Sequence, residues 1–411
     1  MSRLDSERDR KAVLDSLLNF EFVVPFKRIG ECCSVEKGNT PIQKAIPGQY
    51  PLVATTEERQ TSATYQFDAQ AVCVPLISSR GHGVASISRI YYQEGKFALG
   101  NILCAIIPND STVLSAKFLR YYLYRAKDWL LVPLMRGGAN VSLTIDSLKK
   151  VKIPIPPLEI QNEIVRILDT FMELTAELTV ELDARKRQYE YYRDSFFGEN
   201  YSDMLRLADT GKFSLSKLSD VGTFTRGKRF VRDDLVSDGT PCIHYGDLYT
   251  YYGIWADKTK DCLVPEVAEK LRFAHNGDVV IVGAGENNED IGIGVAWFGN
   301  EDAAVHDACY IFKHNMNPKY ISYYLRSHTY HMQIKKHVVR GKICAISATD
   351  IGKALIPIYS LDEQERIVSI LDRFDKLCSD ISAGIPAEIE ARRKQYEHYR
   401  DRLLTFKEKT A

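Results

Sequence analysis

The sequence predicts an α+β protein with two mixed α/β domains separated by two long antiparallel coiled-coil helices, related by a pseudo-twofold internal repeat. Two features predict this class: a helical segment that occurs twice, about 200 residues apart, and a block of short apolar runs before each copy. The 411 residues are 45% hydrophobic and 26% charged, as in a folded protein of two or three domains. A charged N-terminus and the lack of a long apolar stretch predict a cytoplasmic protein without a membrane segment.

The repeat is clearest in the segments with helical periodicity. PIPPLEIQNEIVRILDTF at 154–171 matches PIYSLDEQERIVSILDRF at 357–374, and ARKRQYEYYRDSFF at 184–197 matches ARRKQYEHYRDRLL at 391–404. In both copies apolar residues recur at alternating steps of three and four, which predicts that the helices pack as a coiled coil. A shorter match, LDSLLNF at 14–20 with RDRLLTF at 400–406, predicts a further helical segment at the N-terminus.

These matches divide the chain into five predicted segments. They are an N-terminal helical segment (1–20), a first globular domain (21–157), a central spacer helix (158–197), a second globular domain (198–360) and a C-terminal spacer helix (361–411). The central helix is expected to be about 60 Å long. The second copy has four additional residues near Ser382 to Pro386, and Gly384 with Pro386 predicts an interruption of the C-terminal helix there.

The two globular blocks are alike only at a few ordered points. FLRYYL at 118–123 parallels YISYYL at 320–325, and Arg136-Gly137 parallels Arg340-Gly341. The net charge of the whole chain is zero, yet residues 21–157 contain 16 basic and 10 acidic residues. A segregated basic region of this kind favours a polyanionic partner.

Sequence motifs for catalysis are lacking. The chain has no P-loop, zinc-protease, dinucleotide-binding or methyl-transfer motif, and its nine scattered cysteines are typical of reduced thiols. We therefore expect no catalytic residue, metal or cofactor. One alternative is a stand-alone nuclease or fused restriction enzyme that holds a divalent metal with Asp68, Glu94 and Lys96, the acid and E-x-K pattern. A second alternative function is that of a coiled-coil scaffold with no role in DNA binding.

Two dissimilar blocks, each followed by a near-identical long helix, resemble the specificity subunit of a type I restriction-modification system. The resemblance rests on the two pairs of helical motifs quoted above and spans nearly the full chain. It implies that the blocks are target recognition domains for double-stranded DNA in a noncatalytic subunit. It also implies two kinds of partner: two modification (methyltransferase) subunits, and restriction subunits that form an ATP-dependent translocase and nuclease.

The predicted geometry agrees with a bipartite DNA target. Two domains held apart by rigid helices would contact two separated half-sites, because duplex DNA advances about 34 to 36 Å per turn. The central helix contains two successive tetrads, TAEL at 175–178 and TVEL at 179–182. One tetrad changes the length of a helix by about 6 Å and its phase by about 40°. We expect such a change to alter the unread spacer by one or two base pairs.

Candidate DNA contacts lie in loops that combine small residues, cations and amides. Small residues permit close approach, cations suit phosphates, asparagine suits adenine, and an acid can accept from the cytosine amino group. The ordinary alternative for each loop is a turn or a helix cap. The candidates are Gly38, Asn39, Thr40, Ser78, Ser79, Arg80, His82, Arg136 and Asn140 in the first block, and Arg226, Lys228, Arg229, His244, Tyr245, Asp247, Asn287, Asn288, Arg340 and Lys342 in the second.

Four tyrosines in the spacer helices are candidate contacts for the modification subunits. Tyr189, Tyr192, Tyr396 and Tyr399 fall on more than one helical face, which predicts that part of this aromatic surface remains for partners. The alternative is that they pack helix against helix.

Overall fold

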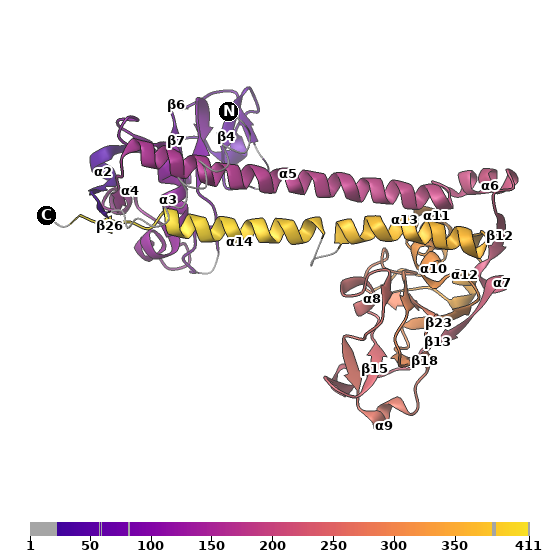
Figure 1. Cartoon of the computed structure of the whole chain (residues 1–411). Coiled ribbons are helices and arrows are strands. Elements are labelled where there is room, and N and C mark those ends of the chain that lie inside the picture. Colours follow the sequence, from indigo (N-terminus) through magenta and orange to yellow (C-terminus); the bar gives the residue numbers. More distant parts are fainter. Residues whose placement is uncertain (1–22, 57, 59, 81–82, 380–383, 410–411) are drawn as a thin grey trace, which may run out of the picture. The chain divides into compact units, whose positions relative to one another are not determined.

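The computed structural model describes residues 23–56, 58, 60–80, 83–379 and 384–409. The chain forms two compact units: one ends at Glu177 and resumes at Glu390, and the other is Leu178–Ile389. Each unit contains one globular block and part of the long helices drawn in Figure 1. The helical segment expected over 1–20 lies outside the described residues. Among the helices that are described, none has the length and apolar composition needed to span a bilayer.

The block of the first unit contains two four-stranded sheets. The first has the order β3-β10-β7-β8 with antiparallel pairs, and the second has the order β5-β4-β9-β6 with β4 and β9 parallel. The strands are β3 (Cys33–Lys37), β4 (Tyr50–Val53), β5 (Gln60–Ser62), β6 (Phe67–Asp68), β7 (Ala71–Pro75), β8 (Tyr91–Gln93), β9 (Lys96–Leu99) and β10 (Leu103–Pro108). A further pair closes the block, β2 (Phe26–Arg28) with β11 (Lys152–Pro154). The helices are α2 (Ile29–Cys32), α3 (Ala116–Leu130) and α4 (Ile145–Lys149).

The block of the second unit repeats this topology. Its first sheet has the order β13-β23-β19-β21, extended by β16, and its second has the order β17-β15-β22-β18, extended by β14, with β15 and β22 parallel. The strands are β13 (Gly222–Arg226), β14 (Leu235–Val236), β15 (Thr240–Ile243), β16 (Trp255–Ala256), β17 (Asp261–Leu263), β18 (Phe273–Ala274), β19 (Val279–Val282), β21 (Gly294–Trp297), β22 (Ala303–Val305) and β23 (Cys309–His314). The closing pair is β12 (Ser214–Lys217) with β25 (Leu355–Ile358). The blocks are therefore two copies of one fold, although their sequences match only faintly.

The helices of the second block differ more from those of the first. In place of α3, two shorter helices follow β23, because Ser327 starts a new helix by accepting a hydrogen bond from the N–H of Tyr330. The helices are α6 (Tyr201–Asp209), α7 (Leu218–Val221), α8 (Asp247–Thr250), α9 (Pro265–Ala268), α10 (Pro318–Tyr324), α11 (His328–Ile334) and α12 (Ala348–Gly352).

The long helices are present as the periodicity predicts. They are α5 (Leu158–Phe197), α13 (Leu361–Ser379) and α14 (Ile385–Leu403). Residues 380–383 are outside the described part, and Pro386 lies in the first turn of α14, where proline is tolerated. In the first unit the ring of Phe171 on α5 stacks on Tyr399 of α14, with 5.2 Å between centroids. In the second unit Tyr192 on α5 stacks on Phe374 of α13 at 5.1 Å.

Two of the long helices, α5 and α13, are each fixed to their block by a buried glutamine in the first turn. Gln161 of α5 is completely buried and accepts a hydrogen bond from the N–H of Ser115 (2.8 Å). Gln364 of α13 is also buried and accepts from the N–H of Asn317 (2.9 Å). Each glutamine also donates to carbonyls of the segment just before its helix. The two glutamines are 203 positions apart, which is the offset of the matched motifs. The internal repeat therefore reproduces the hydrogen bonds between this glutamine and the backbone of its block.

An aspartate two turns further along makes a second fixed contact. Asp169 accepts a hydrogen bond from the Tyr121 hydroxyl (2.5 Å), and Asp372 accepts one from Tyr323 (2.7 Å). In both units a lysine four residues before the tyrosine pairs with the same carboxylate. The aspartate that the two matched motifs share therefore positions each helix on its block.

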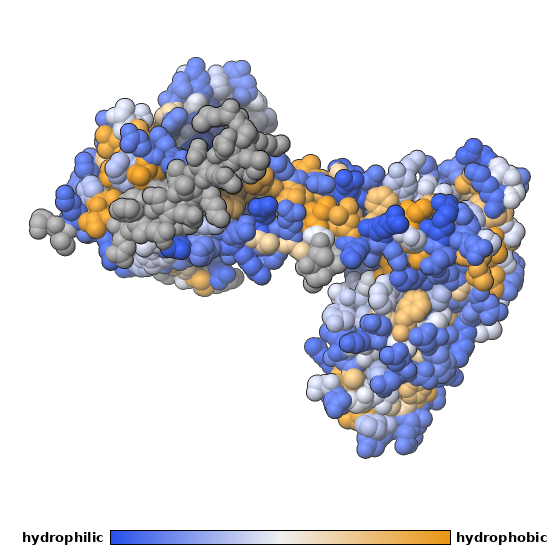
Figure 2. Space-filling model, viewed as in Figure 1, coloured by the Kyte–Doolittle hydropathy of each residue, from blue (hydrophilic) through white to orange (hydrophobic). Residues whose placement is uncertain are grey.

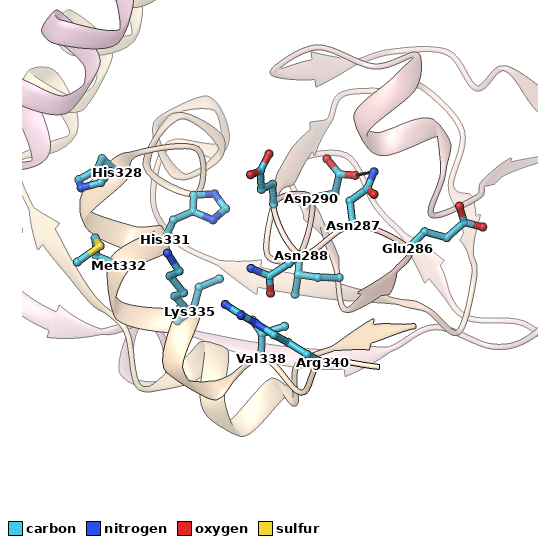
Figure 3. A pocket seen from close by; sticks show the side chains of 13 residues that line it. Glu286, Asn287, Asn288, Asp290, His328, His331, Met332, Lys335, Val338 and Arg340 are labelled. Carbon is cyan, nitrogen blue, oxygen red and sulfur yellow. Dashed lines mark hydrogen bonds between the residues drawn. The ribbon is translucent and has the colours of Figure 1, made fainter. Parts of the chain in front are cut away.

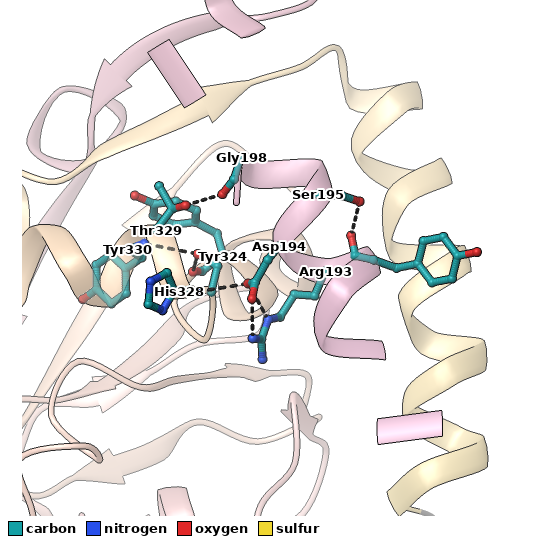
Figure 4. Close-up of polar contacts among 10 residues, drawn as sticks. Arg193, Asp194, Ser195, Gly198, Tyr324, His328, Thr329 and Tyr330 are labelled. Carbon is teal, nitrogen blue, oxygen red and sulfur yellow. Dashed lines mark hydrogen bonds and ion pairs between the residues drawn. The ribbon is translucent and has the colours of Figure 1, made fainter. Parts of the chain in front are cut away.

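The far ends of the long helices are also attached in related ways. Figure 4 shows Asp194, near the end of α5, accepting from the backbone N–H of His328 (3.0 Å), while Thr329 donates to the carbonyl of Gly198. Asp401, near the end of α14, pairs with Arg125 (3.4 Å). After α14 the chain forms β26 (Lys407–Glu408), which lies parallel to β1 (Val23–Val24). Both described ends of the chain thus belong to the first unit.

Two buried histidines predict a pH dependence of stability in the second unit. Burial lowers the pKa of His314 and of His331 to about 4, whereas the imidazole pKa in an unfolded chain is about 6.5. The unfolded chain therefore binds more protons between these values, so the stabilisation is present above pH 6.5 and is lost as the pH falls. We expect each histidine to lower the free energy of unfolding by about 1 to 2 kcal/mol between pH 7 and pH 5.

Urea unfolding at both pH values measures this effect. His314→Asn keeps an acceptor for the N–H of Met316, and we expect it to reduce the difference between pH 7 and pH 5. An unchanged difference in this variant would contradict the assignment to His314.

Candidate nucleic-acid interface

The predicted loops of each block follow one end of its first sheet. In the first block β3 and β7 end where β10 begins, because both strands pair antiparallel to β10. In the second block β13 and β19 end where β23 begins, for the same reason. The loops after β3 and β7, and after β13 and β19, therefore start from equivalent edges. The sequence motifs alone did not show that these loops share an edge.

The glycine loops after β3 and β13 are equivalent and closely packed. A Cβ on Gly38 would lie 2.2 Å from the carbonyl oxygen of Gly100, and one on Gly227 would lie 2.2 Å from that of His306. Only glycine fits at either position, so both have a structural role. Asn39 and the side chains of Lys228 and Arg229 are exposed at the surface beside them, and Thr40 is half-buried, its N–H bonded to the carbonyl of Leu99 (3.1 Å).

Two further loops of the first block lie side by side. The N–H of Ser78 donates to the carbonyl of Val141 (2.9 Å), which joins the loop after β7 to the loop after Arg136. The hydroxyls of Ser78 and Ser79 bond within their own loop, to the carbonyls of Val84 and Ser86. Arg80 is exposed, and His82 lies outside the described residues. The serines thus hold the loop while Arg80 faces solvent.

The loop at Arg136 is closed by backbone pairing. Arg136 and Ser142 exchange two backbone hydrogen bonds of 2.8 Å each, and the guanidinium of Arg136 donates to the carbonyl of Met135 (2.9 Å). Asn140 is exposed near the tip. In the second block the same exchange joins Val339 and Ala345. The structure therefore aligns Arg136 with Val339, one position away from the Arg136 with Arg340 match that the sequence indicates.

The second block places an aromatic cluster beside its basic loop. Parallel pairing of β15 with β22 puts His244 next to His306, with ring centroids 4.8 Å apart. Tyr245 and Phe230 complete the cluster at 5.5 Å and 5.0 Å from the His306 ring. Burial lowers the pKa of both histidines, and Arg229 lowers that of His306 further. The Nδ1 atoms of both rings already accept backbone hydrogen bonds, His244 from the N–H of Gly246 (3.3 Å) and His306 from that of Ala308 (3.1 Å).

Sequence reasoning missed His306 and Phe230. No local motif marks them, because their position depends on strands about 60 residues apart. Arg226 donates to the carbonyl of Asp307 (2.7 Å), and the buried Asp247 pairs with Lys260 (3.0 Å). Both residues therefore hold the surrounding loops in place.

A pocket of about 780 Å³ separates α11 from the loop after β19. Figure 3 shows the nitrogen-bearing ends of Lys335, Arg340 and Asn288 directed toward the same space. Asn288 has a buried side-chain oxygen without a hydrogen-bond partner, whereas Asn287 donates to Asp290 (3.1 Å). Lys342 is exposed. The short strands β20 (Ala284–Gly285) and β24 (Cys344–Ala345) join the two loops, as in the first block.

The four tyrosines predicted as partner contacts mostly pack within their own units. Tyr189 lies against the core of the second unit, and Tyr396 and Tyr399 lie against that of the first. Tyr192 stacks on Phe374 but remains 37% exposed. The role of these residues in binding partners stays a prediction.

The structure pairs two of the three residues of the nuclease alternative. Asp68 and Lys96 are paired across β6 and β9, as that hypothesis requires. Glu94, however, accepts a hydrogen bond from the Tyr92 hydroxyl (2.6 Å). Within the described part of the chain, no three His, Cys, Asp or Glu side chains are grouped to hold a metal ion.

Comparison with known proteins identifies the family. A model of the type I restriction modification DNA specificity domain matches residues 24–184 and 211–391. The chain belongs to this family. A putative type I restriction enzyme specificity subunit of Haemophilus influenzae is 29% identical over 97% of this chain and 100% of its own length. The EcoR124I/EcoR124II specificity subunit of Escherichia coli is 33% identical over 63% of this chain and 64% of its own length.

Solved structures show the same fold. The S subunit of a type I restriction-modification system from M. genitalium has a TM-score of 0.57 and 15% identity, and the match covers 96% of this chain and 98% of that chain. A chain from a study of assembly of the type I system has a TM-score of 0.56, with 94% and 99% covered. The predicted α+β class with two repeated domains and long helices is confirmed, and membership of the family implies a role in DNA target recognition.

Proposed function

We propose that residues 21–157 and 198–360 are two target recognition domains, each reading one half of a bipartite duplex DNA target. The observation that supports this is one fold built twice, with the same helix anchors and with unlike loops at the same sheet edge. Domains that share a framework but differ in their loops suit two unlike half-sites. Cations and amides at these edges supply phosphate and base contacts, respectively.

The chain acts in this proposal as the noncatalytic subunit of a methyltransferase and endonuclease complex. Two modification subunits bring adenine methylation, and restriction subunits bring ATP-driven cleavage. The long helices α5, α13 and α14 hold the domains and bind the modification subunits, for which the exposed faces of Tyr191 and Tyr192 are available. Aromatic residues are enriched at such interfaces.

Methylome sequencing tests the proposal. A host that expresses this chain with its cognate modification subunit should show a split adenine-methylated motif that a host without the chain lacks. Asn288→Ala should relax the letters of one half only, because Asn288 belongs to one block. A continuous motif, or methylation that does not depend on the chain, would overturn the proposal.

A further inference from the structure

Two aliphatic side chains project from the tip of a loop in the second block. In this tip (residues 339–343) Val339 is 71% exposed and Ile343 is 62% exposed. Two backbone hydrogen bonds between Val339 and Ala345, of 2.9 and 3.0 Å, fix the base of the tip. Figure 2 shows a mostly hydrophilic surface on the block in this view. Burying an apolar side chain removes its surface from water, so a partner that covers the tip gains affinity from both Val339 and Ile343.

The chain segment that forms the tip is basic, although the carboxylates of Glu286, Glu289 and Asp290 line the pocket that Arg340 also lines. From Lys335 to Thr349 the chain has four lysine or arginine residues and no acidic residue. Within the tip, Arg340 and Lys342 lie between the two aliphatic residues, separated by Gly341. A surface that is both cationic and apolar suits duplex DNA. The phosphates attract the cations, and the major groove exposes one apolar group on its base edges, the methyl group of thymine.

The equivalent tip of the first block has a different chemistry. Backbone pairing aligns Val339 with Arg136, and the same register aligns Ile343 with Asn140. The first tip therefore presents a cation and an amide where the second presents two methyl-bearing side chains. Two equivalent tips with unlike chemistry are suited to different bases.

We propose that Val339 and Ile343 contact thymine methyl groups in the major groove of the half-site read by residues 198–360. Arg340 and Lys342 then bind the flanking phosphates. This inference rests on the proposed function and names the part of the second half-site that the tip reads, namely at least one A·T pair.

Replacing thymine by deoxyuridine in a synthetic duplex tests this directly, because it removes only the methyl group. The duplex carries the methylated motif, and binding is measured with the complex of this chain and its modification subunit. We expect one or two substitutions in the second half-site to weaken binding about fourfold each, the effect of one buried methyl group. Substitutions in the spacer should have no effect.

Variants of the tip complete the experiment. Val339→Ser and Ile343→Ser should weaken binding to the thymine duplex and abolish the response to deoxyuridine. Ile46→Ser is the matched control, because Ile46 is 72% exposed but lies in the first block, and it should keep the full response. The inference is wrong if no position responds to deoxyuridine or if both tip variants still respond.

Two other outcomes are distinguishable. Loss of binding between the chain and its modification subunit in the tip variants, with DNA affinity unchanged, would assign the tip to a protein partner and overturn the inference. A complex that produces no split motif would overturn the proposed function itself. A split motif without a response to deoxyuridine would overturn only the thymine contact.

Discussion

Deletion of residues 179–182 from α5 is expected to change the spacer of the methylated motif by one or two base pairs and to leave both half-sites unaltered. These residues form the TVEL tetrad, which follows the boundary between the two units at Glu177 and Leu178. The deletion shortens the helix by about 6 Å and turns it by about 40°. The loops of both blocks remain intact, so the bases that they read do not change.

Methylome sequencing of a host that carries the deletion variant measures the result. Methylation at the original motif should be lost entirely and should reappear at the motif with the new spacer. Val180→Ala is the matched control, because it changes an exposed side chain in the same tetrad without altering helix length. Altered letters in either half-site would contradict a role of α5 in spacing alone.

Replacement of Gln161 or Gln364 by alanine is expected to destabilise the unit that contains it by about 2 to 4 kcal/mol. Gln161 bonds to the N–H of Ser115 and to the carbonyls of Val113 and Pro156 at 2.7 to 2.8 Å. Alanine leaves these backbone groups without partners. A buried polar group without a partner costs about 1 to 3 kcal/mol.

Urea unfolding of the purified chain measures this change. Gln395→Ala provides the control, because Gln395 lies on the exposed surface of α14 in the repeated ARRKQYEHYRDRLL segment, and we expect a change within about 0.5 kcal/mol. Equal unfolding midpoints for Gln364→Ala and Gln395→Ala would show that the first-turn glutamine does not fix the helix.

The periodicity of the helices could be predicted because it is local. Apolar residues at steps of three and four specify a helix and its packing face without reference to the rest of the chain. The interruption before α14 likewise follows from Gly384 and Pro386. Gln161 and Gln364 were present in the matched motifs, yet a glutamine at the start of a helix looks solvated until the loop that covers it is known.

The candidate site was less predictable. The sequence indicated most of the loops, but their meeting at one sheet edge depends on strands paired over long separations. His306 was missed for this reason, because the parallel pairing of β15 with β22 brings it beside His244. The match of Arg136 with Arg340 was displaced by one position because backbone pairing, rather than residue type, sets the register.

The sequence by itself determined that this protein contains an internal repeat of one domain followed by a long helix. It also carried the family resemblance that the comparison confirms. These properties can be recognised from sequence because repeats and apolar periodicity occur within continuous segments of the chain. Only the tertiary structure decided which glycines are structural, which aspartates and glutamines anchor the helices, and that Val339 and Ile343 project from the second tip. These outcomes depend on burial and on pairing between distant residues, which a linear pattern does not contain.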